Sequence, residues 1–220
     1  MRKKLVLILN LIIIALGVIG TIIMLQDRPS ETGLTASGAE NLKYFTVLSN
    51  EFCGIVSIIW LVLYICDWSQ GTVKVRRWMT VLKYMAVTAV GLTFLVIAAF
   101  LGPIYGHAML YKNSNLYFHL LLPVVAMIEF AFFDTGERKL PFKNTFLTVI
   151  PTLVYGMAYL VNLLVNGVGE WPDTNDWYGF VNWGLPVGLG IFAGIIVATW
   201  GIACVLRLVN NKVSGAGKDI

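Results

Sequence analysis

Hydrophobic residues gather in six long stretches of this chain, and polar residues, glycines and prolines fall mainly between them. Each stretch is close to the ~20 residues that cross the hydrocarbon core of a bilayer as an α-helix. The pattern therefore predicts six transmembrane helices. Their expected bounds are Leu5–Leu25, Tyr44–Cys66, Trp78–Pro103, Asn115–Phe133, Thr145–Gly167 and Leu185–Leu206.

The composition supports a membrane protein. Of the 220 residues, 58% are hydrophobic and 13% are charged, whereas soluble domains usually carry about 25% charged residues. The connections are short and contain no linker, so we expect an all-α chain with a single six-helix integral membrane domain over residues 1–220. The first stretch is longer than the apolar region of a signal peptide and lacks a suitable cleavage site, so we expect it to be retained.

Basic residues favour one side of the predicted membrane. If the N-terminus is cytoplasmic, 13 of the 16 Lys and Arg residues fall on the inner side and 3 on the outer side, as expected when cytoplasmic loops keep basic residues. Both termini should then be cytoplasmic, and the net charge of +4 gives no reason to expect a nucleic-acid partner. The inner residues are Arg2, Lys3, Lys4, Lys74, Arg76, Arg77, Lys83, Arg138, Lys139, Lys143, Arg207, Lys212 and Lys218, and the outer residues are Arg28, Lys43 and Lys112.

The three cysteines indicate neither a disulfide framework nor a metal site. Cys53, Cys66 and Cys204 lie within or at the ends of predicted helices, with no C-x-x-C spacing and no neighbouring histidine. We expect them to be buried thiols. The pattern implies no metal and no organic cofactor.

Four ionisable side chains fall inside or near the ends of the predicted spans: Glu51, Lys83, His119 and Glu129. Such groups are costly in a bilayer and mark candidate sites. Glu129 lies about 15 Å deeper than His119 at the rise of an α-helix, so we expect it to pair with Lys83 or with a basic loop residue. Glu51 is turned away from Thr46 on the helix and is expected to pair with another helix.

A polar stripe follows the outer part of the second predicted helix. Thr46, Ser49, Asn50 and Cys53 have the spacing i, i+3, i+4, i+7 that places them on one helical face. The stripe lines a cavity or bonds to a neighbouring helix, as Ser, Thr and Asn commonly do in membranes.

His119 falls at nearly the same depth on the fourth predicted helix, about 6 Å from its outer end, against about 3 Å for Thr46. A neutral imidazole can take the proton of a hydroxyl that attacks an acyl carbon and return it to the leaving alcohol. Thr46 and His119 are therefore candidate nucleophile and base, and a structural histidine is the alternative. Pro123 would free the His119 carbonyl and allow a bend at this depth, and His107 is a second candidate base.

The fifth predicted helix presents Tyr155, Tyr159 and Asn162 at i, i+4, i+7. Tyr159 and Asn162 reach the outer layer, where they can contact a substrate, and aromatic packing is the alternative. The segment from residue 169 to 183 carries three Trp and Tyr178, a composition typical of an interfacial aromatic belt. The segment, with Tyr178, either caps the bundle where acyl chains enter or only anchors the protein at the membrane surface. The full set of candidate substrate-binding residues is Ser49, Asn50, Tyr159, Asn162 and Tyr178.

Three short segments resemble the androgen-induced-gene family of six-helix membrane proteins and its bacterial relatives. Lys43–Thr46 is similar to the family's K-(F/Y)-(L/F)-T, and Asn115–Pro123 resembles its N-x3-H-x3-P segment, with Ile128 and Glu129 continuing the match. Trp177–Asn182 resembles its aromatic W-x-Y-P-F-(L/F)-(D/E) stretch before the last helix. Gly179 stands where the family tends to have proline, and Asn182 stands where an acid is frequent.

The resemblance implies a bacterial plasma-membrane threonine hydrolase that cleaves fatty-acyl esters, such as fatty acid esters of hydroxy fatty acids. Carried over by position, Thr46 is the nucleophile and His119 the base, and neither a cofactor nor a metal is implied. Two other functions remain open from the residues alone. One is a lipid-binding or small-molecule-binding membrane protein of the substrate-capture type, without covalent chemistry, and the other is a purely structural bundle.

Overall fold

The computed structural model describes residues 2–26, 38–70, 76–134, 139–170 and 174–216, and within them it contains helices and no strand. Among these described residues, six helical segments are long and apolar enough to cross a membrane, as the sequence predicts. Their bounds are Lys4–Gln26, Phe45–Ser69, Arg77–Tyr105, Ser114–Phe133, Asn144–Asn166 and Leu185–Ser214. The chain is therefore an all-α, multi-pass membrane protein.

Three of the six spans are built from more than one helical piece. The third consists of α3 (Arg77–Leu95), η2 (Val96–Leu101) and α4 (Gly102–Tyr105). The fourth consists of α6 (Ser114–Leu116), η3 (Tyr117–Leu121), α7 (Leu122–Ile128) and η4 (Glu129–Phe133), and the fifth of α8 (Asn144–Leu147) and α9 (Ile150–Asn166). The segments η2, η3 and η4 are π-helical, a widened geometry that is often found at functional sites.

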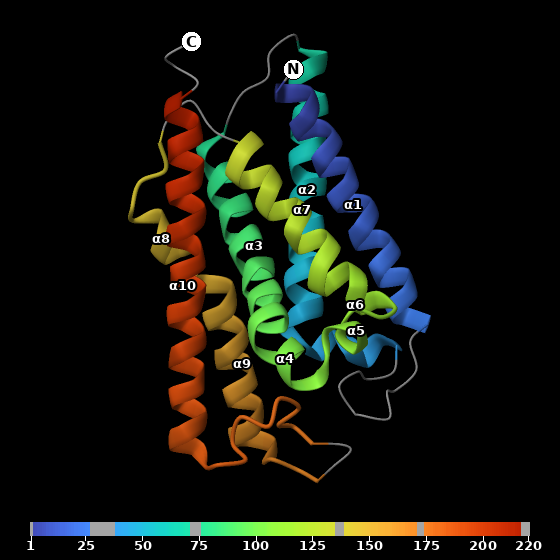
Figure 1. The fold of residues 1–220 in the computed structure, drawn as a ribbon, viewed down its shortest axis with the longest axis vertical. Coiled ribbons are helices and arrows are strands. Elements are labelled where there is room, and N and C mark those ends of the chain that lie inside the picture. Colours follow the sequence, from blue (N-terminus) through green and yellow to red (C-terminus); the bar gives the residue numbers. More distant parts are fainter. Residues whose placement is uncertain (1, 27–37, 71–75, 135–138, 171–173, 217–220) are drawn as a thin grey trace.

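The remaining elements are α1 (Arg2–Gln26), η1 (Gly38–Lys43), α2 (Phe45–Ser69), α5 (His107–Leu110) and α10 (Leu185–Ala216). The start of α1 and the end of α10 lie at one end of the molecule, and α4, α5 and the segment before α10 lie toward the other end (Figure 1). This arrangement agrees with both termini on one side of the membrane. Among the basic residues that orient the chain, Arg28, Lys74, Arg138 and Lys218 lie outside the described residues, as does Trp171 of the expected aromatic belt.

The core forms around α3. Tyr84 of α3 is fully buried, stacks on Phe130 of η4 with 5.1 Å between the ring centroids, and donates a 2.5 Å hydrogen bond to the carbonyl of Ala203 in α10. One tyrosine thus joins three spans. On the other side of the molecule, a close approach brings α1 to η3, because a Cβ at Gly20 would lie 2.7 Å from the ring of Phe118.

The expected pairing of the ionisable side chains is confirmed. Lys83 Nζ lies 2.5 Å from Glu129 Oε1, and both side chains are buried. The hydroxyl of Thr21 in α1 donates to Glu51 Oε1 of α2, which is the cross-helix contact expected for Glu51. Neither acid is hydrogen-bonded to Thr46 or His119.

Candidate functional site

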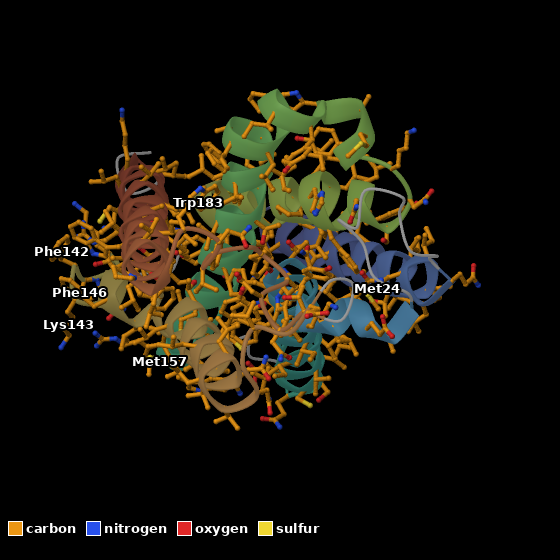
Figure 2. The ribbon with its side chains drawn as sticks, turned by 90° about the horizontal axis from the view of Figure 1, so that it is seen from below. Met24, Phe142, Lys143, Phe146, Met157 and Trp183 are labelled. Carbon is orange, nitrogen blue, oxygen red and sulfur yellow. The ribbon has the colours of Figure 1, made fainter. Side chains whose placement is uncertain are left out.

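A cavity of about 500 Å³ lies between α2, the third span, α9, α10 and the segment that precedes α10. Its wall is mostly apolar, with Leu92, Phe100 and Phe192 among the contributors. Viewed from the end that carries the segment before α10, α9 and α10 stand on one side of the molecule and α1 stands on the other (Figure 2). The polar groups in the lining are few: Thr46, Thr93, Thr152, Tyr155, Tyr159 and Tyr178.

Thr46 lies in the first turn of α2 and lines this cavity. Its carbonyl accepts hydrogen bonds from Ser49 Oγ at 3.0 Å and from Asn50 Nδ2 at 2.7 Å. Within the described part of the chain, its hydroxyl and its backbone N–H have no hydrogen-bond partner. The first turn of a helix leaves N–H groups unpaired and carries the positive end of the helix dipole, so Thr46 presents a hydroxyl and a backbone donor together.

The start of α2 is capped by the segment before α10 rather than by its own side chains, because Tyr44 precedes the helix without a side-chain capping bond. The N–H of Phe45 donates to the Tyr178 hydroxyl at 2.8 Å. The Tyr155 hydroxyl donates to the carbonyl of Lys43 at 2.6 Å. Burial raises the pKa of Tyr178 well above its usual value, so this phenol stays protonated at neutral pH. The polar end of the cavity is therefore fixed by tyrosines from two distant segments.

His119 lies in η3 and is buried. Its Nδ1 is 2.7 Å from the carbonyl oxygen of Leu110. A carbonyl oxygen only accepts, so Nδ1 carries the proton and the lone pair of the neutral ring is on Nε2. This is the tautomer that a general base requires. In this structure His119 is not in the cavity lining, and no hydrogen bond joins it to Thr46.

Asn50 connects the two helical segments that carry Thr46 and His119. Its Nδ2 donates to the Thr46 carbonyl and, at 2.9 Å, to the Phe118 carbonyl in η3. The sequence predicts that Pro123 frees the carbonyl of His119, but that expectation assumes α-helical spacing. In the π-helix the N–H of Leu122 donates to the carbonyl of Tyr117, five residues earlier. By the same spacing, the carbonyl left without a donor by Pro123 is that of Phe118. This is the carbonyl that accepts a hydrogen bond from Asn50.

The other predicted site residues divide into two groups. Tyr159 and Tyr178 line the cavity with Thr46. Ser49 and Asn162 do not; Ser49 Oγ lies 3.2 Å from Thr93 Oγ1, and Asn162 Nδ2 donates to Asn175 Oδ1 at 3.3 Å.

Asp176 is a site residue that the sequence analysis missed. The residue is only 5% exposed, and its carboxylate accepts hydrogen bonds from the Tyr159 hydroxyl and, both at 2.9 Å, from the N–H groups of Phe180 and Val181. The available signal was an acid at the start of an Asp-Trp-Tyr-Gly turn, where Asp commonly accepts bonds from nearby backbone groups. Asp176 therefore sets the fold of the segment that supplies Tyr178.

No protein-family model, curated protein sequence or solved structure matches this chain. Its function is consequently inferred from the cavity and the residues around it.

Proposed function

We propose that this protein is an intramembrane lipid ester hydrolase of a bacterial plasma membrane, with both termini cytoplasmic. Thr46 is the nucleophile, His119 is the base, and the substrate is a fatty-acyl ester. The observation that supports this function best is the position of Thr46, whose hydroxyl lies in the wall of a mostly apolar cavity and has no hydrogen-bond partner among the described residues. A volume of about 500 Å³ is in the range of ~300–1,000 Å³ that is usual for small-molecule pockets.

In the proposed reaction, His119 Nε2 takes the proton of Thr46 Oγ1 as this oxygen attacks the acyl carbon. The tetrahedral intermediate collapses, the bond to the alcohol oxygen breaks, and the alcohol leaves with the proton from His119. Water then attacks the acyl-threonine ester, with His119 again taking and returning the proton. Leu110 fixes the tautomer that this cycle needs.

The negative charge that develops on the acyl oxygen needs hydrogen-bond donors. Ser49, Asn50 and Asn162 already donate to groups of the protein. The N–H of Thr46 has no partner among the described residues and lies at the positive end of a 25-residue helix, so it is the better placed donor. The attacking oxygen and this donor then belong to the same residue.

A second function is a lipid-binding or small-molecule-binding protein, of the substrate-capture type, without covalent chemistry. The observation that favours it is the absence of His119 from the cavity lining, together with the apolar character of the wall. In that case the cavity holds an acyl chain, and the tyrosines hold its polar end.

The two functions are separated by labelling with an alkyl fluorophosphonate and by hydrolysis of a fluorogenic long-chain ester in detergent. If the protein is a hydrolase, the probe labels Thr46. Thr46→Ala and His119→Ala then each lower turnover by at least about 10³-fold, and the two losses do not add in the double variant. His107→Ala is the matched histidine control and should retain activity, since the exposed His107 bonds to the Ala98 carbonyl.

Thr46→Ser keeps the hydroxyl and should retain part of the rate. If wild-type protein binds a fluorescent fatty acid but shows no labelling and no turnover, the binding function is correct and the hydrolase is refuted.

A further inference from the structure

Three ionisable side chains meet at the other end of the bundle from Thr46. Lys83 of α3 lies between Glu129 of η4, at 2.5 Å, and Asp134, at 3.2 Å. The side chains of Lys83 and Glu129 are 2% and 0% exposed, and that of Asp134 is 17% exposed. With every group ionised, the cluster holds one positive and two negative charges.

Among the residues that the structure describes, the neighbouring elements supply no second positive charge to this cluster. From α1 comes the amide of Asn10, and from α2 come the buried thiol of Cys53 and the ring of Trp60, with Lys83 Nζ 5.2 Å from its centroid. On α10, Asn210 bonds to the Phe130 and Asp134 carbonyls, and Arg207 donates to the carbonyl of Leu140. A buried charge without a counter-ion is strongly disfavoured at low dielectric, so one acid of the three-residue cluster is in excess.

The two carboxylate oxygens of Glu129 differ in their hydrogen bonds. Oε1 accepts bonds from Lys83 Nζ and, at 3.0 Å, from Asn10 Nδ2. Oε2 is fully buried and has no partner among the described residues, and the same holds for Asn10 Oδ1. Glu129 and Asn10 thus contact each other, yet each keeps one oxygen that accepts no hydrogen bond from the described residues. The Asn10 amide cannot be turned to cure this, because its Nδ2 already serves Glu129 Oε1 and the carbonyl of Val6.

We propose that Glu129 and Asn10 form a proton-binding site, in which Glu129 is protonated on Oε2 at neutral pH and donates this proton to Asn10 Oδ1. One hydrogen bond then pairs both unpartnered oxygens. The proton also leaves Lys83 and Asp134 as a balanced ion pair. The resulting acid–amide pair joins α1 to the fourth span, and the partly exposed Asp134 provides the route by which the site exchanges its proton with water.

Infrared difference spectroscopy of the full-length protein in lipid vesicles at neutral pH tests this site. The wild-type spectrum minus that of Glu129→Gln should contain the carbonyl band of a protonated carboxylic acid, and ¹³C labelling of glutamate should shift it. Glu51→Gln is the matched control, because Glu51 and Glu129 are the two glutamates in the described spans. That variant should keep the band. A difference spectrum with carboxylate bands alone would overturn the proposal.

Two further variants test the partners. Asp134→Asn leaves Glu129 as the counter-ion of Lys83, so the acid band should vanish, and its persistence would contradict the charge balance. Asn10→Ala removes the acceptor, so the band should move to higher frequency; an unshifted band would show that Glu129 does not donate its proton to Asn10. If Glu129→Gln fails to fold, Glu51→Gln protein is measured with and without ¹³C-labelled glutamate. An acid band that shifts with the label supports the protonated Glu129, and the lack of such a band overturns the proposal.

Discussion

The change Asp176→Ala is expected to destabilise the protein strongly. Asp176 is 5% exposed, and its carboxylate accepts three hydrogen bonds, from the Tyr159 hydroxyl and from the N–H groups of Phe180 and Val181. A hydrogen bond to a charged group contributes roughly 1.5–3 kcal/mol, and a donor left buried without a partner costs a similar amount. Phe180 and Val181 are only half-buried, so water replaces part of what their donors lose.

Because water replaces part of the lost hydrogen bonds, we expect the free energy of unfolding to fall by about 3–5 kcal/mol, based on the range for charged hydrogen bonds. For a chain of this size the loss corresponds to a decrease of roughly 10 °C in the unfolding midpoint. The assay is thermal unfolding of the purified protein in a mild detergent. The cap that Tyr178 forms on Phe45 should be lost with the fold of the segment, so binding of a fluorescent fatty acid should also weaken.

Two controls make the Asp176 result interpretable. Asp176→Asn keeps the oxygen that serves Tyr159 and Phe180 and loses the acceptor of Val181, so its cost should be about a third of that of Asp176→Ala. Asn182→Ala changes an exposed side chain in the same segment and should alter stability by less than about 0.5 kcal/mol. A free energy of unfolding for Asp176→Ala within about 1 kcal/mol of the wild-type value would be too small a difference for three lost bonds and would exclude this role of Asp176.

Two other outcomes follow from the cavity wall. Gly156→Ala should lower fatty-acid affinity, because its Cβ would lie 1.9 Å from the Phe192 ring and must displace that lining side chain; titration with a fluorescent fatty acid measures this, and unchanged affinity would contradict it. Since burial raises the pKa of Tyr178, its contribution to stability is full below the unfolded value of about 10 and is lost as the pH rises above it. The unfolding temperature of Tyr178→Phe should therefore fall less steeply with rising alkaline pH than that of the wild type. An equal slope would show that Tyr178 does not contribute to the alkaline loss of stability.

The spans were predictable because apolar length is a local property of the sequence. The predicted fourth helix, Asn115–Phe133, differs by one residue from the observed Ser114–Phe133. The last helix was predicted to end at Leu206 but continues to Ala216. Its final turns are polar, so hydropathy does not detect them. They are stabilised by tertiary bonds, such as that of Asn210 Nδ2 to the Phe130 carbonyl at 2.6 Å.

The candidate site was predictable only in part. Helical spacing placed Thr46, Ser49 and Asn50 on one face, yet Thr46 lines the cavity while Asn50 turns its amide to backbone carbonyls. Spacing also predicted the depth of His119, and that prediction assumed a regular α-helix around it. The π-helix at Tyr117–Leu121 changes the direction in which the ring points. Asp176 was not predictable, because its partners are set by a loop conformation that a single sequence does not reveal.

The chemistry proposed for Thr46 depends on how the first turn of α2 is completed. Val47 and Leu48 bond through their N–H groups to the Tyr44 carbonyl, and the N–H of Phe45 bonds to Tyr178. Thr46 is left with a free donor among the described contacts of this turn. Because Tyr178 is held by the segment that Asp176 organises, residues about 130 positions further along the chain determine which donor at the helix start stays free. A substitution in that segment should therefore alter the cavity chemistry and the stability together, whereas one at the Glu129 cluster should alter stability alone.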